Sequence, residues 1–379
     1  MPGSRLLLAL TVPPLAFALA CGSDGAGPSA PAGLPACGAA TLFTVSPIAD
    51  TNIREVAPLG NLNPSGHVFP TDHIYLYPPG NASGTNLVPV VSPGTIRIGS
   101  VNVQKRMTPG AAEFDDYGMT FYLCATQEFY FGHLSSLSAD LQARVGTLGG
   151  GCNAPYQTGN STFQQCYKSV NITLNAGDAI GTAGGPQEGA LDLGAIDHAQ
   201  APLAYVDAGR QTGAGGLYTA CPLDYFAPAA QSALLARVAV NGTPRTTPPI
   251  CGTVMQDVAN TAQGRWFFDA TAQEDHHLAL VHASVNPAIG AFSIGTSIPG
   301  VSPTVLSFSP AQSGRVNLDF DRVTADGNIY CYQQFTFAPG TLYIRLATNS
   351  RLRVQLGPNA TCGDPSTWSF GATAVTFDR

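Results

Sequence analysis

The chain has 379 residues and a formal net charge of −7, and only 11% of its residues are charged. Its two lysines, Lys105 and Lys168, stand far apart and no basic patch forms, so a nucleic-acid partner is not expected. With 44% hydrophobic residues the chain can bury the core of one or two domains, while 42 Gly and 30 Pro argue against a helical protein.

The first 21 residues, MPGSRLLLALTVPPLAFALAC, carry one Arg, an apolar centre and small residues before Cys21. This pattern predicts a secretory signal peptide over residues 1–21, too short to span a bilayer. Its end resembles a bacterial lipobox, in which the Cys carries a lipid and becomes the mature N-terminus. Residues 22–36 are small, polar and Pro-rich, which predicts a flexible tether. We therefore expect an exported protein, in the periplasm or at the cell surface, that meets the membrane through a lipid on Cys21. Ordinary secretion is the alternative.

Short alternating runs follow the tether and are separated by Gly, Pro and Asn, which predicts antiparallel strands joined by turns. In TIRIGSVNV the apolar alternation slips by one residue at Gly99-Ser100, which predicts a β-bulge. Two helices are predicted, one over 135–145 with Ser135 or Ser136 as its cap, and one over 225–240.

The Pro-rich segment 241–252 predicts a domain boundary, and about eight strands follow it at regular spacing. We expect an all-β, mainly antiparallel fold, with a first β domain at 37–220, a helix and Pro-rich linker at 221–250, and a second β-sandwich or barrel at 251–379. The expected strands of the second domain are GRWFFDA, HHLALVHASV, AFSIGTSIP, RVNLDFDRV, NIYCYQQF, GTLYIRLATN, RLRVQLG and ATAVTFDR. In GRWFFDA the aromatic residues are predicted to be core, and EDHHLALVH is predicted to begin a solvated strand.

The nine cysteines are an odd number, and setting Cys21 aside as the lipid carrier leaves eight. An even set in an exported chain predicts disulfides. Proximity in the sequence favours three pairs and leaves a fourth: Cys152–Cys166, Cys221–Cys251, Cys331–Cys362 and Cys37–Cys124.

Three stretches between residues 45 and 200 occur in a suggestive order. GHVFPTDH, with His67, Asp72 and His73, comes first, ahead of VPVVSPGTI; EFYFGHLSSLS, with His133, is next; and LNAGDAIGTAGG precedes GALDLGAIDH. This order resembles the lysostaphin-type murein endopeptidases, which have the duplicated-hybrid-motif β fold. The resemblance implies such a fold for the first domain, and it implies zinc bound by an early His and Asp and by one imidazole of a late His-x-His pair.

The match to that family is uneven from residue to residue. Phe131-Gly132-His133-Leu134 keeps the aromatic-x-His-Leu spacing, so the resemblance gives His133 the role of the family's strand histidine. Asp72 matches the early aspartate, but His67 stands five residues before it instead of four. At the late pair, Leu191 and Leu193 occupy the histidine positions, although other alignments place Asp192 or His198 there.

Leucine cannot ligate a metal, and catalytic zinc needs three protein ligands and an open position for water. The remaining candidate ligands are His67, Asp72, His73 and His198. Asp72 and His73 would point to opposite faces of a strand, so both can ligate only if the backbone turns there.

Because the ligand set is incomplete, we expect the protein to have no cofactor. Zinc is the one candidate if a cofactor binds. The expected function is non-catalytic binding or scaffolding at the cell envelope, with a cell-wall glycan, such as peptidoglycan, or a peptide as partner. One alternative is a zinc-dependent murein endopeptidase that uses His67, Asp72 and either His73 or His198 as relocated ligands and His133 as acid/base. A purely structural surface protein is the other alternative.

Overall fold

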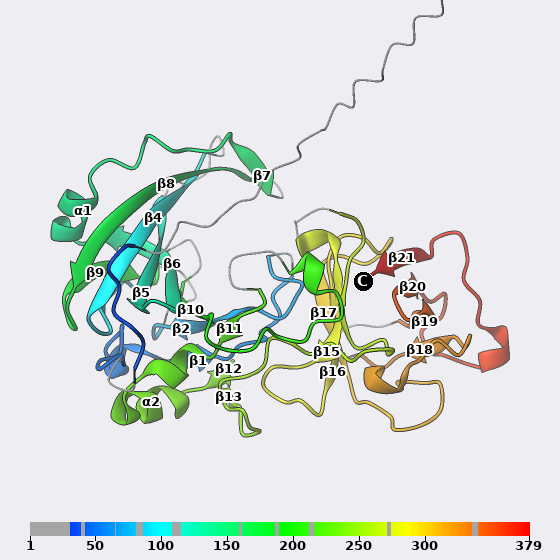
Figure 1. Cartoon of the computed structure of the whole chain (residues 1–379). Coiled ribbons are helices and arrows are strands. Elements are labelled where there is room, and N and C mark those ends of the chain that lie inside the picture. Colours follow the sequence, from blue (N-terminus) through cyan, green and yellow to red (C-terminus); the bar gives the residue numbers. More distant parts are fainter. Residues whose placement is uncertain are drawn as a thin grey trace, which may run out of the picture.

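The structure is a computed structural model of the chain, and it shows two β domains side by side (Figure 1). The predicted signal peptide, Cys21 and most of the tether lie outside the described residues. The structure describes residues 31–38, 42–64, 66–80, 86–107, 115–158, 161–185, 189–211, 216–270, 274–335 and 340–379.

The first domain is built on an 11-stranded sheet in which neighbouring strands pair antiparallel. Strand β10 lies between β2 and β6, and this order brings distant parts of the sequence together. Along the main path the strands are β1 (Glu55–Ala57), β2 (His73–Tyr77), β10 (Leu191–Asp197), β6 (Gln127–Leu137), β5 (Asp115–Cys124), β4 (Ile96–Arg106), β8 (Ser161–Leu174) and β7 (Tyr156–Thr158). Off this path lie β3 (Val88–Val91), β9 (Ala179–Ala183) and β11 (Thr219–Ala220).

The predicted bulge at Gly99-Ser100 is confirmed, because the pairing of β4 with both β5 and β8 shifts between Ile98 and Ser100. Both predicted helices exist but are shorter than expected. Helix α1 (Ala139–Val145) is capped by Ser138, whose hydroxyl accepts a hydrogen bond from the amide of Leu141. Residues 135–137 belong to β6, so the prediction of Ser135 or Ser136 as the cap was wrong.

Helix α2 (Pro228–Leu235) ends well before residue 240, because the chain turns into a small hairpin of β12 (Ala239–Val240) and β13 (Thr243–Pro244). Short 3₁₀ turns lie at η1 (Asp50–Asn52), η2 (Ala208–Arg210), η3 (Pro222–Tyr225), η4 (Glu274–His276), η5 (Phe320–Arg322) and η6 (Pro365–Thr367).

The second domain contains two four-stranded antiparallel sheets. The first sheet comprises β14 (Gly264–Trp266), β15 (Leu278–His282), β16 (Gly290–Ile294) and β17 (Thr304–Phe308), and the second comprises β18 (Tyr330–Tyr332), β19 (Leu342–Thr348), β20 (Arg351–Leu356) and β21 (Val375–Asp378). The predicted strand RVNLDFDRV is wrong: Asn317 there has a left-handed φ of 51°, and η5 follows. Strand β17 was not predicted.

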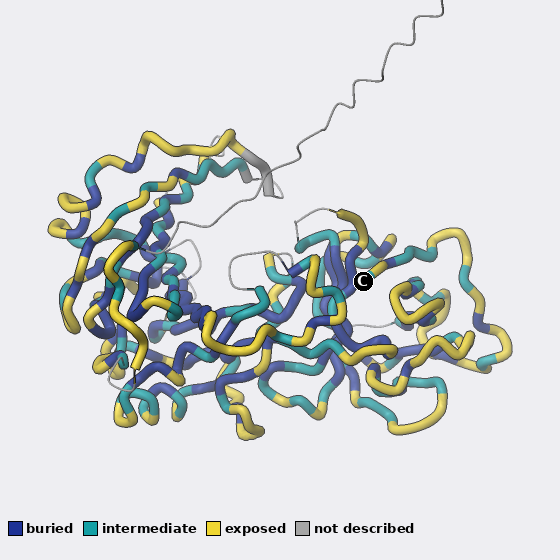
Figure 2. Tube along the Cα trace, viewed as in Figure 1, coloured by how far each residue is buried: buried dark blue, intermediate teal, exposed yellow. Residues whose placement is uncertain are grey.

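The all-β, mainly antiparallel fold class is confirmed, although the described strands do not close into a barrel. One apolar core takes its residues from Phe43 to Cys251, and a second takes them from Ala262 to Phe377. In Figure 2 the buried trace runs through the sheets of both domains. A smaller apolar cluster, which includes Phe69 and Phe267, joins the two domains.

All four predicted disulfides are present, namely Cys37–Cys124, Cys152–Cys166, Cys221–Cys251 and Cys331–Cys362. Four disulfides are typical of a protein exported to an oxidising compartment. Within the described ranges, no helix combines the length and the apolar character that crossing a membrane requires.

Candidate functional site

The loop at residues 67–72, which begins with His67 and is called the histidine loop below, leads directly into β2. Its backbone is fixed by a short bridge in which the amide of His67 donates to the carbonyl of Asn63 at 2.7 Å, and by the amide of Thr71, which donates to the carbonyl of Asn61. The chain bends at Asp72, and His73 is the first residue of β2. This bend lets Asp72 and His73 face each other, so Asp72 Oδ1 lies 2.8 Å from His73 Nδ1.

Asp192 lies on β10 between two histidines that come from the neighbouring strands. Its Oδ2 is 3.4 Å from Nε2 of His73 on β2 and 3.3 Å from Nε2 of His133 on β6. The other ring nitrogen of each histidine is held by a second carboxylate, since His133 Nδ1 lies 2.7 Å from Asp116 Oδ2 on β5. We call His73, His133 and Asp192 the histidine–aspartate cluster, with Asp72 and Asp116 behind it.

Local backbone features direct these side chains toward one another. His133 adopts a φ of 61°, a left-handed conformation that is strained for a residue other than glycine and that turns it out of the regular strand. Gly132, directly opposite Asp192, leaves room for the carboxylate, because a Cβ there would lie 3.0 Å from Asp192 Oδ2. Tyr130 donates its hydroxyl to Asp72 Oδ1 at 2.8 Å and so fixes the carboxylate behind His73.

The charges of the cluster and of its neighbours shift the pKa values of several groups in this region. Burial raises the pKa of Asp72, but the hydrogen bonds from His73 and Tyr130 and the charge of His73 outweigh it and bring the pKa to about 2. Burial lowers the pKa of His73, yet the carboxylates of Asp192 and Asp72 raise it above its ordinary value. Burial and the neighbouring His73 lower the pKa of His67, whose neutral form is therefore favoured near pH 7.

The hydrogen-bond pattern of the two cluster histidines leaves one polar contact to be explained. An imidazole that donates its Nδ1–H to a carboxylate has a lone pair on Nε2 when it is neutral. Both Nε2 atoms would then present lone pairs to an oxygen of Asp192, which is repulsive unless a proton or a metal ion lies between them. Among the described residues, His73 Nε2, Asp192 Oδ1 and Asp116 Oδ1 are buried with no hydrogen-bond partner.

The distances from Asp192 Oδ2 to the two Nε2 atoms agree with those between neighbouring ligands of a small metal ion. In a tetrahedral zinc site with bonds of about 2.0–2.1 Å, neighbouring ligand atoms are about 3.3–3.4 Å apart. Over the described ranges, however, no group of three or more His, Cys, Asp or Glu is arranged so that it could hold a metal ion as it stands. The arrangement is thus two imidazoles converging on one carboxylate oxygen, not a closed ligand shell.

The structure brings together some of the predicted site residues and separates others. The rings of His67 and His73 are 5.2 Å apart, and His133 joins them through Asp192. His198 instead lies beside Tyr218, with 5.0 Å between the rings, and its amide donates to the carbonyl of Thr126. It follows Asp192 by six residues, about 20 Å along an extended chain. Asp72 supports His73 from behind and does not face the Asp192 side of its ring.

Sequence reasoning missed three members of this region, which are Asp116, Tyr130 and Glu274. Only Tyr130 carried a local signal, since it lies three residues before His133 in EFYFGHL. Leu191 and Leu193, at the positions where the resembled family has its histidines, are fully buried in the core of the first domain.

The second-domain segment EDHHLALVH was predicted to begin a solvated strand, and this prediction was wrong for His277. That residue is only 1% exposed and stacks on Phe69 of the histidine loop, with 5.4 Å between the rings. The core prediction for GRWFFDA is confirmed for Trp266 and Phe267, whereas Phe268 is 42% exposed.

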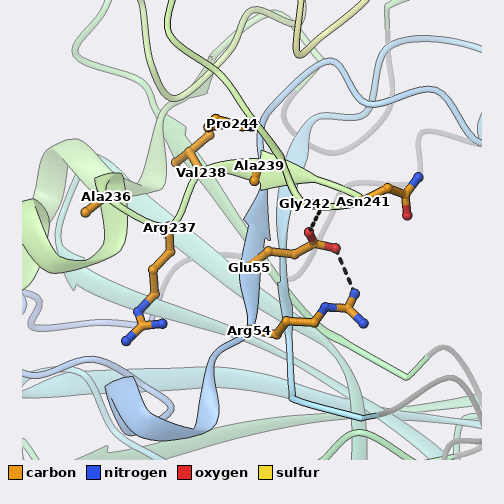
Figure 3. A pocket seen from close by; sticks show the side chains of 9 residues that line it. All are labelled: Arg54, Glu55, Ala236, Arg237, Val238, Ala239, Asn241, Gly242 and Pro244. Carbon is orange, nitrogen blue, oxygen red and sulfur yellow. Dashed lines mark hydrogen bonds and ion pairs between the residues drawn. The ribbon is translucent and has the colours of Figure 1, made fainter.

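A cavity of about 610 Å³ lies apart from the cluster, along β1 and the β12–β13 hairpin (Figure 3). Its most polar feature is the carboxylate of Glu55. This carboxylate already accepts hydrogen bonds from the Arg54 guanidinium at 2.7 Å and from the Gly242 amide at 2.9 Å. None of its lining residues belongs to the histidine–aspartate cluster.

No protein-family model, no curated protein and no solved structure matches this chain.

Proposed function

We propose that the first domain of this exported protein holds a divalent metal ion, with zinc the first candidate, between His73, His133 and Asp192, and that it hydrolyses a peptide of the cell envelope. One observation carries the proposal. Two imidazoles, from the strands on either side of β10, present Nε2 to the same oxygen of Asp192. Each imidazole is held from behind by a carboxylate, as metal-ligating histidines usually are.

The chemistry of this donor set fits zinc. Two imidazoles and one carboxylate are a common set at catalytic zinc centres. The resembled endopeptidases have the same composition, two histidines and one aspartate. Here the carboxylate comes from Asp192 on β10, and the two imidazoles come from His73 on β2 and His133 on β6. A cation in this position would also satisfy the buried Nε2 of His73.

The surrounding residues would prepare this site for hydrolysis. Zinc, when bound, would act as a Lewis acid and lower the pKa of a water molecule. The side chain of His133 is 25% exposed and that of His67 is 36% exposed, so the cluster is reached by solvent from their side. His67 favours its neutral form near pH 7, so its ring can accept a proton beside His73.

The choice of substrate and location rests on the resemblance and on the N-terminal segment. The lysostaphin-type family cleaves cell-wall peptides, and a lipid on Cys21 would keep this domain at the envelope where such peptides occur. The four disulfides fit an exported location.

A second candidate function is non-catalytic binding of a cell-wall glycan or peptide. The observation that favours it is the burial of Leu191 and Leu193 where the family has histidines, because it removes the second catalytic imidazole of the resembled site. In this function the cluster, which solvent reaches at His133, would contact the ligand.

Metal content tests the first proposal. The purified protein should retain about one zinc per chain after dialysis, and Asp192→Ala should lose it because only two imidazoles remain. His198→Ala is the matched control, since it removes a histidine outside the cluster and should keep the metal. A wild-type protein that binds no zinc, nickel or cobalt, even when these metals are added, would refute the metal site.

Incubation with purified cell-wall sacculi separates the two functions. A hydrolase should release soluble peptide fragments, and the release should stop when zinc is removed and in Asp192→Ala. Retention of the wild type on sacculi without any release, together with weaker retention of Asp192→Ala, would instead support the binding function.

A further inference from the structure

The second domain reaches into the candidate site through the histidine loop. The amide of Phe69 donates to Glu274 Oε2 at 3.3 Å, and the carbonyl of Pro70 accepts from Arg265 Nη2 at 3.2 Å. These two contacts join residues separated by about two hundred positions in the chain. They fasten both sides of the peptide between Phe69 and Pro70, only two residues before Asp72.

Apolar and aromatic packing reinforces these hydrogen bonds. The side chain of Phe69 is 5% exposed and packs against Phe267, with 5.1 Å between ring centroids, and against His277. The Arg265 guanidinium lies 5.0 Å from the Phe69 ring centroid, in the geometry of a cation–π contact. A phenylalanine from the first domain is therefore enclosed by residues of the second.

Arg265 is itself held in place by both domains. Its Nη1 donates to Gln211 Oε1 at 2.5 Å, its amide donates to Asp257 Oδ1 at 3.0 Å, and its guanidinium lies over the ring of Tyr205 at 4.6 Å. A guanidinium fixed at so many points defines the position of the Pro70 carbonyl, and through it the start of the bend at Asp72.

Glu274 also lies next to His67, which neighbours the cluster. Its Oε2, which accepts from the Phe69 amide, also lies 3.8 Å from Nδ1 of His67. One carboxylate of the second domain thus touches both the backbone of the histidine loop and the imidazole that lies beside His73.

We propose that Glu274 and Arg265 are positioning residues of the site. The second domain would hold the loop at residues 67–72 so that Asp72 meets His73 Nδ1 and His67 lies beside His73. The proposal rests on the proposed metal site for its functional meaning. The second domain would then be part of the active centre, not a separate binding module.

Zinc affinity, measured by competition with a chromophoric chelator, tests this role in the full-length protein. Glu274→Ala and Arg265→Ala should each weaken binding about ten-fold or more, as the loss of groups that orient metal ligands usually does. Glu274→Gln should restore most of the affinity, because an amide oxygen can still accept from the Phe69 amide. Asp319→Ala is the matched control, since it removes a histidine–carboxylate contact of 3.0 Å to His282 in the same domain.

Two further measurements separate a positioning role from a purely structural one. The visible spectrum of the cobalt-substituted protein should change in Glu274→Ala but not in Asp319→Ala, because it reports the geometry around the metal. In the metal-free protein, amide hydrogen exchange should speed up at Phe69 and Thr71 in both alanine variants.

The possible failures are distinguishable. A wild-type protein without metal refutes the proposed function, and the exchange rates alone then decide whether the second domain positions the loop. Unchanged exchange in both alanine variants overturns the inference. Faster exchange with unchanged zinc affinity and an unchanged cobalt spectrum also overturns it, because the position of the loop would then not matter to the site.

Discussion

The order of the strands in the sheet determines which residues surround Asp192. Strand β10 has β2 on one side and β6 on the other, so a side chain near its middle meets residues from two distant segments. Asp192 pairs with Tyr75 of β2 and with Gly132 of β6, which places it diagonally to His73 and next to His133. The same carboxylate on an edge strand would meet only one of the two histidines.

The carboxyl group of Glu274 should make the stability of the protein depend on pH. Burial raises its pKa from 4.5 to about 7, although Arg265 and the Phe69 amide oppose the rise. The folded metal-free protein therefore binds more protons than the unfolded chain between about pH 4.5 and 7, and the contribution of Glu274 to stability is lost as the pH rises through this range. Since the side chain is 35% exposed, solvent screens the effect, and we expect about 1 kcal/mol or less.

The measurement is chemical denaturation of wild type and Glu274→Gln at pH 4.5 and pH 8, with a chelator present. The glutamine variant should gain stability relative to wild type between the two pH values, because an amide does not titrate. Stabilities that change in parallel with pH for the two proteins would contradict the raised pKa.

The sequence predicted part of this site and could not predict the rest. The resemblance had grouped His67, His73 and His133, and in the structure His67 lies beside His73 while His133 and His73 both approach Asp192. In LDLGAID, however, either the leucines or Asp192 can face the site, because side chains alternate along a strand. Only the register with β2 and β6 decides between them. Glu274 lies 205 residues from Phe69, and no local pattern links the two.

At the scale of the element, Gly194 allows β10 to carry the site. It pairs with His73 on one side and with Tyr130 on the other, and the Tyr130 ring lies directly over it. A Cβ at Gly194 would come within 2.1 Å of that ring, so the ring or the strand would have to move. Glycine inside a strand commonly marks such a close approach.

We therefore expect Gly194→Ala to destabilise the protein by about 2 kcal/mol and to weaken metal binding, because Tyr130 would be pushed away from Asp72. Urea denaturation and chelator competition measure the two effects. Gly150→Ala is the matched control, since a Cβ there meets nothing within 4 Å, and it should change neither. Equal stability of the two variants would show that Tyr130 moves aside at no cost.

The elements themselves were predicted best where a pattern had one interpretation. The phase slip in TIRIGSVNV gave the bulge, because only an extra residue can change the face of alternating side chains. The helix predicted from the Ala- and Leu-rich run at 225–240 was too long. Helix propensity is a weak preference, and the pairing of β12 with β13 overrides it. Asn317 had no distinguishing signal, and its left-handed backbone ended a predicted strand.

At the scale of the whole molecule, the disulfides follow the order of the chain. All four bridges join cysteines that are consecutive in the sequence once Cys21 is set aside, and three of them close loops of at most 31 residues. The fourth, Cys37–Cys124, closes 87 residues and ties the start of the first domain to the end of β5. Proximity predicted the set correctly because every bridge stays within one of the two domains.

The two bridges of the first domain with the most different loop lengths should contribute unequally to stability. A bridge stabilises mainly by restricting the unfolded chain, so the longer loop should contribute more, about 4.5 kcal/mol for Cys37–Cys124 and about 3 kcal/mol for Cys152–Cys166. The two sites are matched, because Cys124 and Cys166 are both almost fully buried and their replacement by Ala leaves similar local defects. Denaturation of the two double-alanine variants should show the larger loss of stability for Cys37→Ala/Cys124→Ala. The reverse order would mean that local packing around β8, not the length of the closed loop, determines what each bridge contributes.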